Sequence, residues 1–307
     1  MSSVAFFPVY PLAVRVVGAV VPGGVSLGAI VVTVACGAAS FVLFHRWCRA
    51  RLNPASSRAA LIALAVYPFS WFLYGAAYSD ALYLVLVLAA FLLLESDRPV
   101  VAGLVGAIAT AARPTGVTLV IGLVAVAADR RGLFRRSPGR RFARRDFGVL
   151  LSIGGLLAWC AWLGVRFGNP LAFVETEGAP GWNQPPGPHT WLKLGFFHQL
   201  SRLPPPEVIA IVLQACLFVG CLCLIPAVVR RFGPGYAIYA AAAALVPAIS
   251  SGDFLGLGRY LLPAFPVFAV VGVAATARRR WGVPAAGASG CLLVAGTALF
   301  ASGYLVS

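Results

Sequence analysis

Apolar runs separated by short polar stretches extend through the whole sequence. A membrane-spanning helix needs about 20 predominantly apolar residues, and several runs reach that length while others are shorter. The pattern predicts an all-α protein, a polytopic transmembrane helix bundle of about ten spans. The predicted spans are 25–44, 59–77, 81–94, 100–112, 117–128, 147–165, 208–229, 236–250, 260–277 and 283–303.

The composition supports this fold class. Hydrophobic residues make up 60% of the 307 residues and charged residues only 11%, whereas a soluble domain is about one quarter charged. A separate soluble enzyme module is therefore excluded, and we expect residues 1–307 to form a single integral-membrane domain.

The net charge of +15 would suggest nucleic-acid binding in a soluble protein, but here the basic residues gather between apolar runs. Eighteen of the 24 lysines and arginines lie in five short connections, which the positive-inside rule places in the cytoplasm. We expect a multi-pass protein of the plasma membrane that contacts membrane lipids and binds no nucleic acid. The five connections are 45–58, 95–99, 129–146, 230–235 and 278–282.

Residues 100–128 could form one long helix kinked at Pro114, or two helices that turn at residues 113–116. Both flanking connections are basic, so the chain must cross an even number of times between them. Parity therefore predicts two helices with the turn outside. It also places residues 78–80, the long loop 167–207 and residues 251–259 outside.

Prolines 8 and 11 and Arg15 interrupt residues 4–21, which favours an interfacial or re-entrant helix there.

Two outer residues could carry chemistry. Asp80 could accept a proton, because a carboxylate at the end of an apolar helix is costly unless it faces a wet cavity; alternatively, Ser79 or Asp80 caps the following helix. Arg113 could bind an anion, or its side chain could extend to the outer lipid headgroups.

Arg259 stands where an outer loop enters a helix, with Gly258 permitting close backbone approach. A phosphate site and a plain ion pair with Asp253 are both consistent with this position. In the long loop, Trp182 and Trp191 could stack on sugar rings or simply lie at the membrane interface. The cysteines and histidines lack metal-ligand spacing, and no nucleotide-binding motif occurs, so we expect no metal and no cofactor.

Five strings resemble, in order and spacing, motifs of the PIG-V-like mannosyltransferases, a family of polytopic C-type glycosyltransferases. The match covers almost the whole chain, and each string alone is a weak signal. The strings are AFFPVYPL (5–12), YSDALY (78–83), ARPTGV (112–117), FGNPLAF (167–173) and GRYLLPAFPVF (258–268).

The resemblance implies transfer of a sugar, typically mannose, from a polyprenyl-phosphate donor to a lipid or glycan acceptor on the outer side, with inversion at the anomeric carbon. Arg113 and Arg259 match arginines of the family motifs, and Asp80 matches an acidic position that is usually Glu. Tyr78 and Tyr260 stand in the same motifs, and we expect them, with Arg113, Asp253, Arg259 and Trp182, to bind substrate.

The sequence departs from the family at its start. Family members carry a first transmembrane helix and an outer Trp-Asp motif before FFPxYP, and the aspartate is the presumed catalytic base. Here Met1 immediately precedes the FFPVYP region. We therefore expect at most weak transfer by these 307 residues, with Asp80 and Glu175 as candidate substitute bases. The alternatives are a non-catalytic truncated relative and a lipid or solute transporter.

The topology is testable by cysteine labelling from either side of the membrane. We expect a cysteine at Arg136 to react only from the cytoplasmic side and one at Trp182 only from the outer side. Labelling of both from one side would contradict the parity argument.

Overall fold

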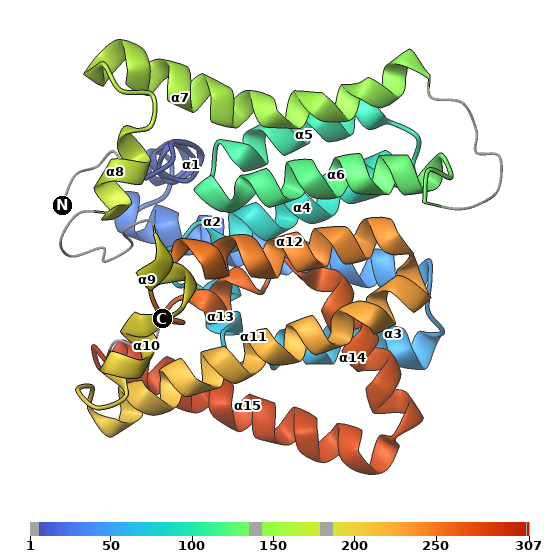
Figure 1. Cartoon of the computed structure of the whole chain (residues 1–307), viewed down its shortest axis with the longest axis vertical. Coiled ribbons are helices and arrows are strands. Elements are labelled where there is room, and N and C mark those ends of the chain that lie inside the picture. The colour runs from blue at the N-terminus through green and yellow to red at the C-terminus, as the bar shows by residue number, and fades with distance from the viewer. Residues whose placement is uncertain (1–5, 135–142, 179–186, 305, 307) are drawn as a thin grey trace.

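The structure is a computed structural model that describes residues 6–134, 143–178, 187–304 and 306. Every regular element in this part of the chain is helical. Among the described residues, four helices are long and apolar enough to cross a membrane, and the longer helices run roughly along a common axis (Figure 1). The four are α2 (Gly24–Arg49), the helix formed by η4 (Arg144–Ile153) with α7 (Gly154–Phe167), α11 (Pro205–Phe232) and α15 (Arg279–Ala301).

The other helices are shorter, and several begin with a proline, whose fixed φ suits the first helical position. They are α1 (Val9–Gly18), α3 (Pro54–Ala65), η2 (Ser70–Leu73), α4 (Asp80–Glu95), α5 (Pro99–Thr110), η3 (Pro114–Gly116), α6 (Val117–Arg130), α8 (Ala172–Gly178), α9 (Pro188–Trp191), α10 (Leu194–Gln199), α12 (Pro234–Ser250), α13 (Leu257–Tyr260) and α14 (Phe265–Ala277).

Each of the ten predicted spans contains a helix, but length and composition support only four of them as membrane-crossing. Two predicted spans are interrupted. The segment 59–77 breaks because α3 ends at Ala65, shortly before Pro68, and a proline disfavours helical backbone in the residue before it. The segment 260–277 breaks at Pro263, so that α14 begins only at Phe265.

The residues around Pro114 form two helices and not one kinked helix. Arg113 is extended, with φ −157° and ψ 147°, and the short η3 leads into α6. An extended residue before proline is the conformation that the proline ring favours. The prediction of a turn at residues 113–116 is confirmed.

The described residues of the basic connections lie at one end of the bundle (Figure 1), which we call the basic end. Contacts within and between these connections hold it together. They join Arg51 to Glu95, Arg131 to Asp146 (2.5 Å), Arg145 to Asp97 (2.5 Å) and the Gly235 amide to the Asp129 carboxylate (3.2 Å).

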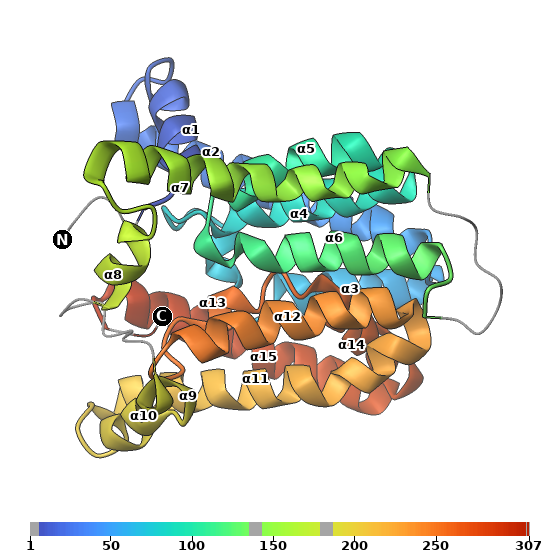
Figure 2. The same ribbon diagram turned by 45° about the horizontal axis from the view of Figure 1, so that its top comes forward.

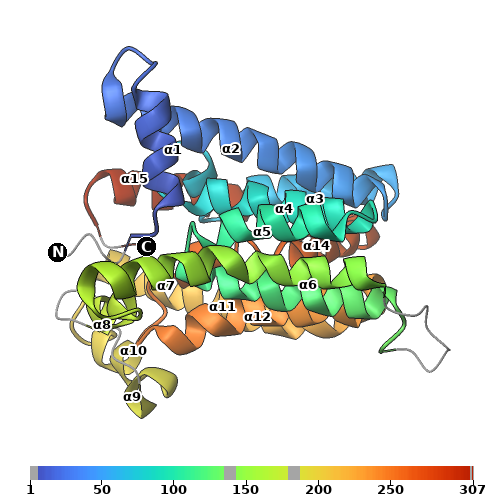
Figure 3. The same ribbon diagram turned by 90° about the horizontal axis from the view of Figure 1, so that it is seen from above.

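The opposite end, which we call the site end, gathers α1, α8, α9, α10 and α13 (Figures 1 and 2). The predicted long loop 167–207 contains three of these short helices, α8 to α10. Trp182 lies outside the described residues. The ten-residue α1 packs across the start of α2 (Figure 3), where the Tyr10 hydroxyl lies 3.2 Å from the Thr33 hydroxyl. Whether α1 is interfacial or re-entrant stays a prediction.

An aromatic core joins four helices in the middle of the bundle. Trp47 of α2 and Phe91 of α4 both contact Phe265 of α14, with ring centroids 4.9 and 5.5 Å apart. Tyr239 of α12 lies edge-on to Phe91 at 4.7 Å. All four side chains are fully buried, so this cluster fixes the mutual positions of the helices that carry the site.

Two adjacent glycines of α7 provide a test of helix packing. A Cβ at Gly155 would lie 1.8 Å from the Ala107 carbonyl oxygen of α5, whereas a Cβ at Gly154 would meet only the Ala107 Cβ at 4.0 Å. We expect Gly155→Ala to lower the free energy of unfolding by about 1–3 kcal/mol through overpacking. Gly154→Ala should be neutral or stabilising, because alanine favours a helix more than glycine does. Urea unfolding in detergent micelles measures both, and equal effects would contradict the close approach of α5 and α7.

Candidate functional site

A buried ion pair lies at the site end. Arg113 Nη1 donates to Asp80 Oδ1 at 2.5 Å, and the two side chains are 6% and 1% exposed. Asp80 is the first residue of α4, and Ser79 before it makes no capping hydrogen bond through its side chain. Both simpler interpretations are therefore wrong: the Asp80 carboxylate faces Arg113 instead of capping α4, and Arg113 is held inside the protein instead of extending to lipid headgroups.

Local structure on both sides holds this pair in place. The Tyr83 hydroxyl, one turn along α4 from Asp80, lies 3.2 Å from the Thr118 hydroxyl and donates to the Thr115 carbonyl at 3.4 Å. These bonds fasten the turn that carries Arg113 to the helix that carries Asp80. The Arg113 guanidinium also lies over the Tyr260 ring, 4.7 Å from its centroid.

The short helix α13 presents Arg259 beside this pair. Gly256, which precedes it, has φ +79°, a backbone conformation that favours glycine. A Cβ at Gly258 would lie 2.4 Å from the Phe69 ring, so the predicted close backbone approach is confirmed.

Two residues that the sequence did not indicate hold the backbone of α13. The Tyr67 hydroxyl donates to the Gly258 carbonyl at 2.9 Å, and the Gly258 amide donates to the Gln214 side chain at 2.9 Å. Both Tyr67 and Gln214 are buried. A tyrosine and a glutamine inside the predicted apolar spans 59–77 and 208–229 were the available signal, since buried polar groups need partners.

Arg259 lies among aromatic rings. Its guanidinium carbon is 4.8 Å from the Tyr78 centroid, 5.1 Å from Tyr260 and 5.5 Å from Phe72. Each contact of this kind stabilises a cation by about 0.5–2 kcal/mol. The Tyr260 ring thus contacts both arginines, which joins Arg113 and Arg259 into one cluster with Asp80. We call Tyr78, Asp80, Arg113, Arg259 and Tyr260 the site cluster.

The ion pair between Asp253 and Arg259 that the sequence allowed is not present among the described residues. The Asp253 carboxylate accepts hydrogen bonds from the Gln199 side chain at 2.7 Å and from the Leu255 amide at 2.9 Å. Its position in a turn favours this local backbone contact. Asp253 therefore lies outside the site cluster, and its predicted role in substrate binding stays a prediction.

The site cluster contains two buried polar atoms that have no hydrogen-bond partner in the described structure, Asp80 Oδ2 and Arg259 Nε. With Asp80 and Arg113 neutralising each other, the formal charge of the cluster is that of Arg259. Arg259 itself is partly accessible. The arrangement can bind an anion through Arg259 and can accept a hydrogen bond or a proton at Asp80.

Other predicted residues lie elsewhere at this end. Glu175 is exposed on α8, and no hydrogen bond or ion pair within the described ranges joins it to the site cluster. The ring of Trp191 on α9 is also exposed. In the same residues no group of three His, Cys, Asp or Glu side chains could hold a metal ion.

Lys193, which the sequence did not single out, fastens the α9–α10 segment to the end of α12. Its ammonium group donates to the carbonyls of Ala248 and Ser251, and to that of Asp253 at 3.1 Å. Burial lowers the pKa of Lys193 to about 8, against the opposing effect of the Asp253 charge. Even so, the ammonium form is the one that donates these bonds.

Comparison of the chain with protein-family models, curated proteins and solved structures gives no match.

The buried pair can be tested by a double-mutant cycle. Arg113→Met leaves Asp80 buried and unpaired, so we expect a loss of about 3–5 kcal/mol in the free energy of unfolding. The double variant Asp80→Leu/Arg113→Met should recover much of this loss, because it leaves no unpaired charge. As a control, Arg145→Met breaks the half-exposed pair with Asp97 and should cost less than about 1 kcal/mol. The single variant Asp80→Leu completes the cycle, and additive effects of Asp80→Leu and Arg113→Met in the double variant would contradict a coupled pair.

Proposed function

We propose that the protein is a membrane glycosyltransferase that transfers a sugar from a polyprenyl-phosphate donor to a lipid or glycan acceptor. Two neighbouring groups support this proposal. Arg259 is partly accessible and has no carboxylate partner among the described residues, and Asp80 is a buried carboxylate with one oxygen that has no hydrogen-bond partner there. Transfer from a lipid phosphate needs these two functions side by side: a cation for the leaving phosphate and a base for the acceptor hydroxyl. The family resemblance of the motifs around both residues supports the same reaction.

In the proposed reaction, the acceptor oxygen attacks the anomeric carbon of the sugar, and the bond from that carbon to the phosphate oxygen breaks. The acceptor proton passes to Asp80 Oδ2. The polyprenyl phosphate leaves with the bonding electron pair, and Arg259 stabilises its charge. Attack opposite the leaving group inverts the anomeric carbon.

The other members of the cluster position these two groups. Arg113 binds Asp80 Oδ1 and so directs the second oxygen of the carboxylate away from itself. The Tyr260 ring contacts both guanidinium groups, and Tyr78, with its ring partly exposed, can stack on a sugar. Because Asp80 is 1% exposed, an acceptor reaches it only when neighbouring side chains move, and the arrival of the donor phosphate at Arg259 supplies a reason for such a movement.

We further propose that the bundle crosses the membrane about ten times with the basic end in the cytoplasm of a plasma-membrane protein. The site end then faces outward, where lipid-linked sugars are used without nucleotide. This topology is supported by the grouping of the basic connections at one end and of the site cluster at the other. Glu175 and Trp182 remain candidates for contacts with the acceptor from the long outer loop.

The decisive substitution is Arg259→Lys, which keeps the charge but loses the planar fork that binds phosphate at two points. We expect sugar transfer from a polyprenyl-phosphate-mannose donor in membranes to fall at least tenfold, a loss of about 1.4 kcal/mol in transition-state stabilisation. Arg202→Lys is the matched control, because Arg202 is exposed near the site end and belongs to no contact of the cluster. Full transfer by a folded Arg259→Lys variant would remove Arg259 from the site.

The base is identified by Asp80→Asn and Glu175→Gln, assayed in the same membranes. We expect Asp80→Asn to lower the rate roughly 10²–10⁴-fold, the usual contribution of positioned proton transfer, while donor binding persists because Arg259 is intact. The opposite result, loss with Glu175→Gln alone, would assign the base to the outer loop. Donor translocation across vesicles without any transfer would contradict the glycosyltransferase proposal and favour a transporter.

A further inference from the structure

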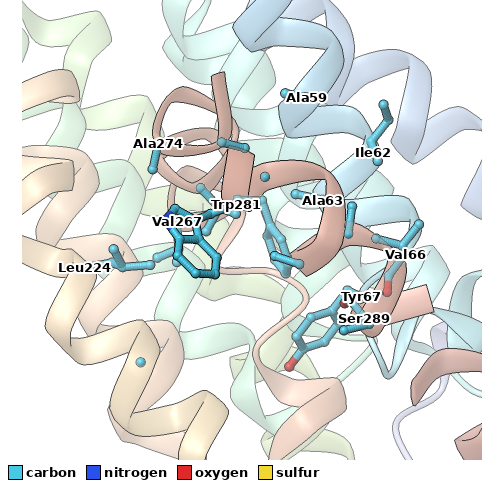
Figure 4. Close-up of a pocket in the computed structure, with 18 of the residues that line it drawn as sticks. Ala59, Ile62, Ala63, Val66, Tyr67, Leu224, Val267, Ala274, Trp281 and Ser289 are labelled. Carbon is cyan, nitrogen blue, oxygen red and sulfur yellow. Dashed lines mark hydrogen bonds between the residues drawn. The ribbon is translucent and has the colours of Figure 1, made fainter. Parts of the chain in front are cut away.

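A cavity of about 1200 Å³ lies between α3, α11, α14 and α15. It is larger than most small-molecule sites, which measure roughly 300–1,000 Å³. Figure 4 shows lining side chains from these helices, including Ala63, Leu224, Ala274 and Trp281. The lining consists almost entirely of apolar residues, many of them alanine or glycine, and a lining of this kind suits hydrocarbon chains.

The cavity exists because α15 stands away from the rest of the bundle. No residue of α15 is buried. It meets its neighbours mainly at separate points along its length: Gly282 lies against Ala275, the Ser289 hydroxyl donates to the Val66 carbonyl at 2.8 Å, and Phe300 stacks on Trp71 at 5.7 Å. Between these points α15 lines the cavity with Val283, Ala285, Ala286, Ala288 and Leu292.

The charged residues that line the cavity are two arginines, Arg278 and Arg279, at the turn from α14 to α15. This turn belongs to the basic end. Both residues are exposed, and neither forms an ion pair with any described residue. Trp281 beside them also lines the cavity and is largely exposed, which is typical of a tryptophan at the level of lipid headgroups.

We propose that this cavity binds an anionic glycerophospholipid. Its acyl chains lie along the apolar lining of α3, α11, α14 and α15, and its phosphate is held by Arg278 and Arg279. Basic pockets between helices at the positively charged side of a membrane protein bind anionic headgroups for this reason. The site is separate from the proposed reaction and does not depend on it.

The positions of the charges favour a phospholipid over the polyprenyl donor as the occupant. Asp80, Arg113 and Arg259 do not line the cavity. A lipid with its phosphate at Arg259 would place its headgroup at the site end, whereas the cavity carries its arginines at the basic end. The two arginines of the cavity therefore suit a lipid whose headgroup lies at the basic end, away from the site cluster.

Native mass spectrometry of the delipidated protein in detergent micelles tests this proposal. Phosphatidylglycerol and phosphatidylcholine with the same acyl chains serve as probes. We expect phosphatidylglycerol to bind the unsubstituted chain at least tenfold more tightly, and Arg278→Gln/Arg279→Gln to remove that preference. The control pair Arg230→Gln/Arg231→Gln removes the same charge from the basic end but from residues that do not line the cavity. This control variant should keep the preference for phosphatidylglycerol.

A second pair of variants tests the apolar lining of the cavity. Ala63→Phe/Ala274→Phe should weaken binding of both phospholipids at least tenfold. Gly287→Phe/Gly290→Phe adds two phenyl rings at open positions of α15 outside the cavity and should leave binding unchanged. In case the filled variant does not fold, a photoactivatable phosphatidylglycerol should cross-link the unsubstituted protein to peptides of α14 and α15.

The proposal would be overturned by equal affinity for the two phospholipids, by equal loss of preference in both arginine pairs, or by cross-linking that avoids α14 and α15. Displacement of phosphatidylglycerol by polyprenyl phosphate, with loss of polyprenyl phosphate binding in Ala63→Phe/Ala274→Phe, would assign the cavity to the donor chain. A failure of the Arg259→Lys prediction would leave all of these measurements unaffected.

Discussion

An isolated carboxylate or guanidinium inside an apolar bundle is very costly, and this cost determines how the site end is built. Asp80 begins an apolar helix and Arg113 begins the turn between two others, so the two charges are tolerated there only in contact. Their contact in turn fixes the turn at Pro114 against α4. Because Asp80 is paired with Arg113, Arg259 has no carboxylate partner among the described residues. Its charge is accommodated by the faces of neighbouring aromatic rings and by partial exposure.

Much of this arrangement could be predicted from the sequence. Hydrophobic runs located the helices, and the distribution of arginines placed the basic connections at one end. The parity argument then brought Asp80, Arg113 and Arg259 to a common end, where the structure also has them. These predictions succeed because they depend on long, repeated signals: apolar length and charge asymmetry over many residues.

The pairing within the cluster could not be predicted. Asp253 lies only six residues from Arg259, whereas Asp80 lies 33 residues from Arg113. Proximity in sequence therefore suggested an ion pair between Asp253 and Arg259, which is not present among the described residues, and did not indicate the pair of Asp80 with Arg113. The outcome depends on how α4 packs against the turn at Pro114, which no single-segment signal encodes. Similarly, the prolines at positions 68 and 263 were visible, but whether they kink a span or end it depends on what packs beside them. The support of α13 by Tyr67 and Gln214 is a tertiary feature of the same kind.

The loose attachment of α15 has a consequence for how the protein responds to its surroundings. At about 1.5 Å per residue, its 23 residues measure roughly 35 Å, while the 13 residues of α14 beside it measure only about 20 Å. A long helix held at a few points adjusts to a thinner bilayer by tilting, and the tilt would change the width of the space beside α14. We therefore expect bilayer thickness to alter the shape of this side of the molecule, while the aromatic core around Phe265 keeps the opposite side fixed.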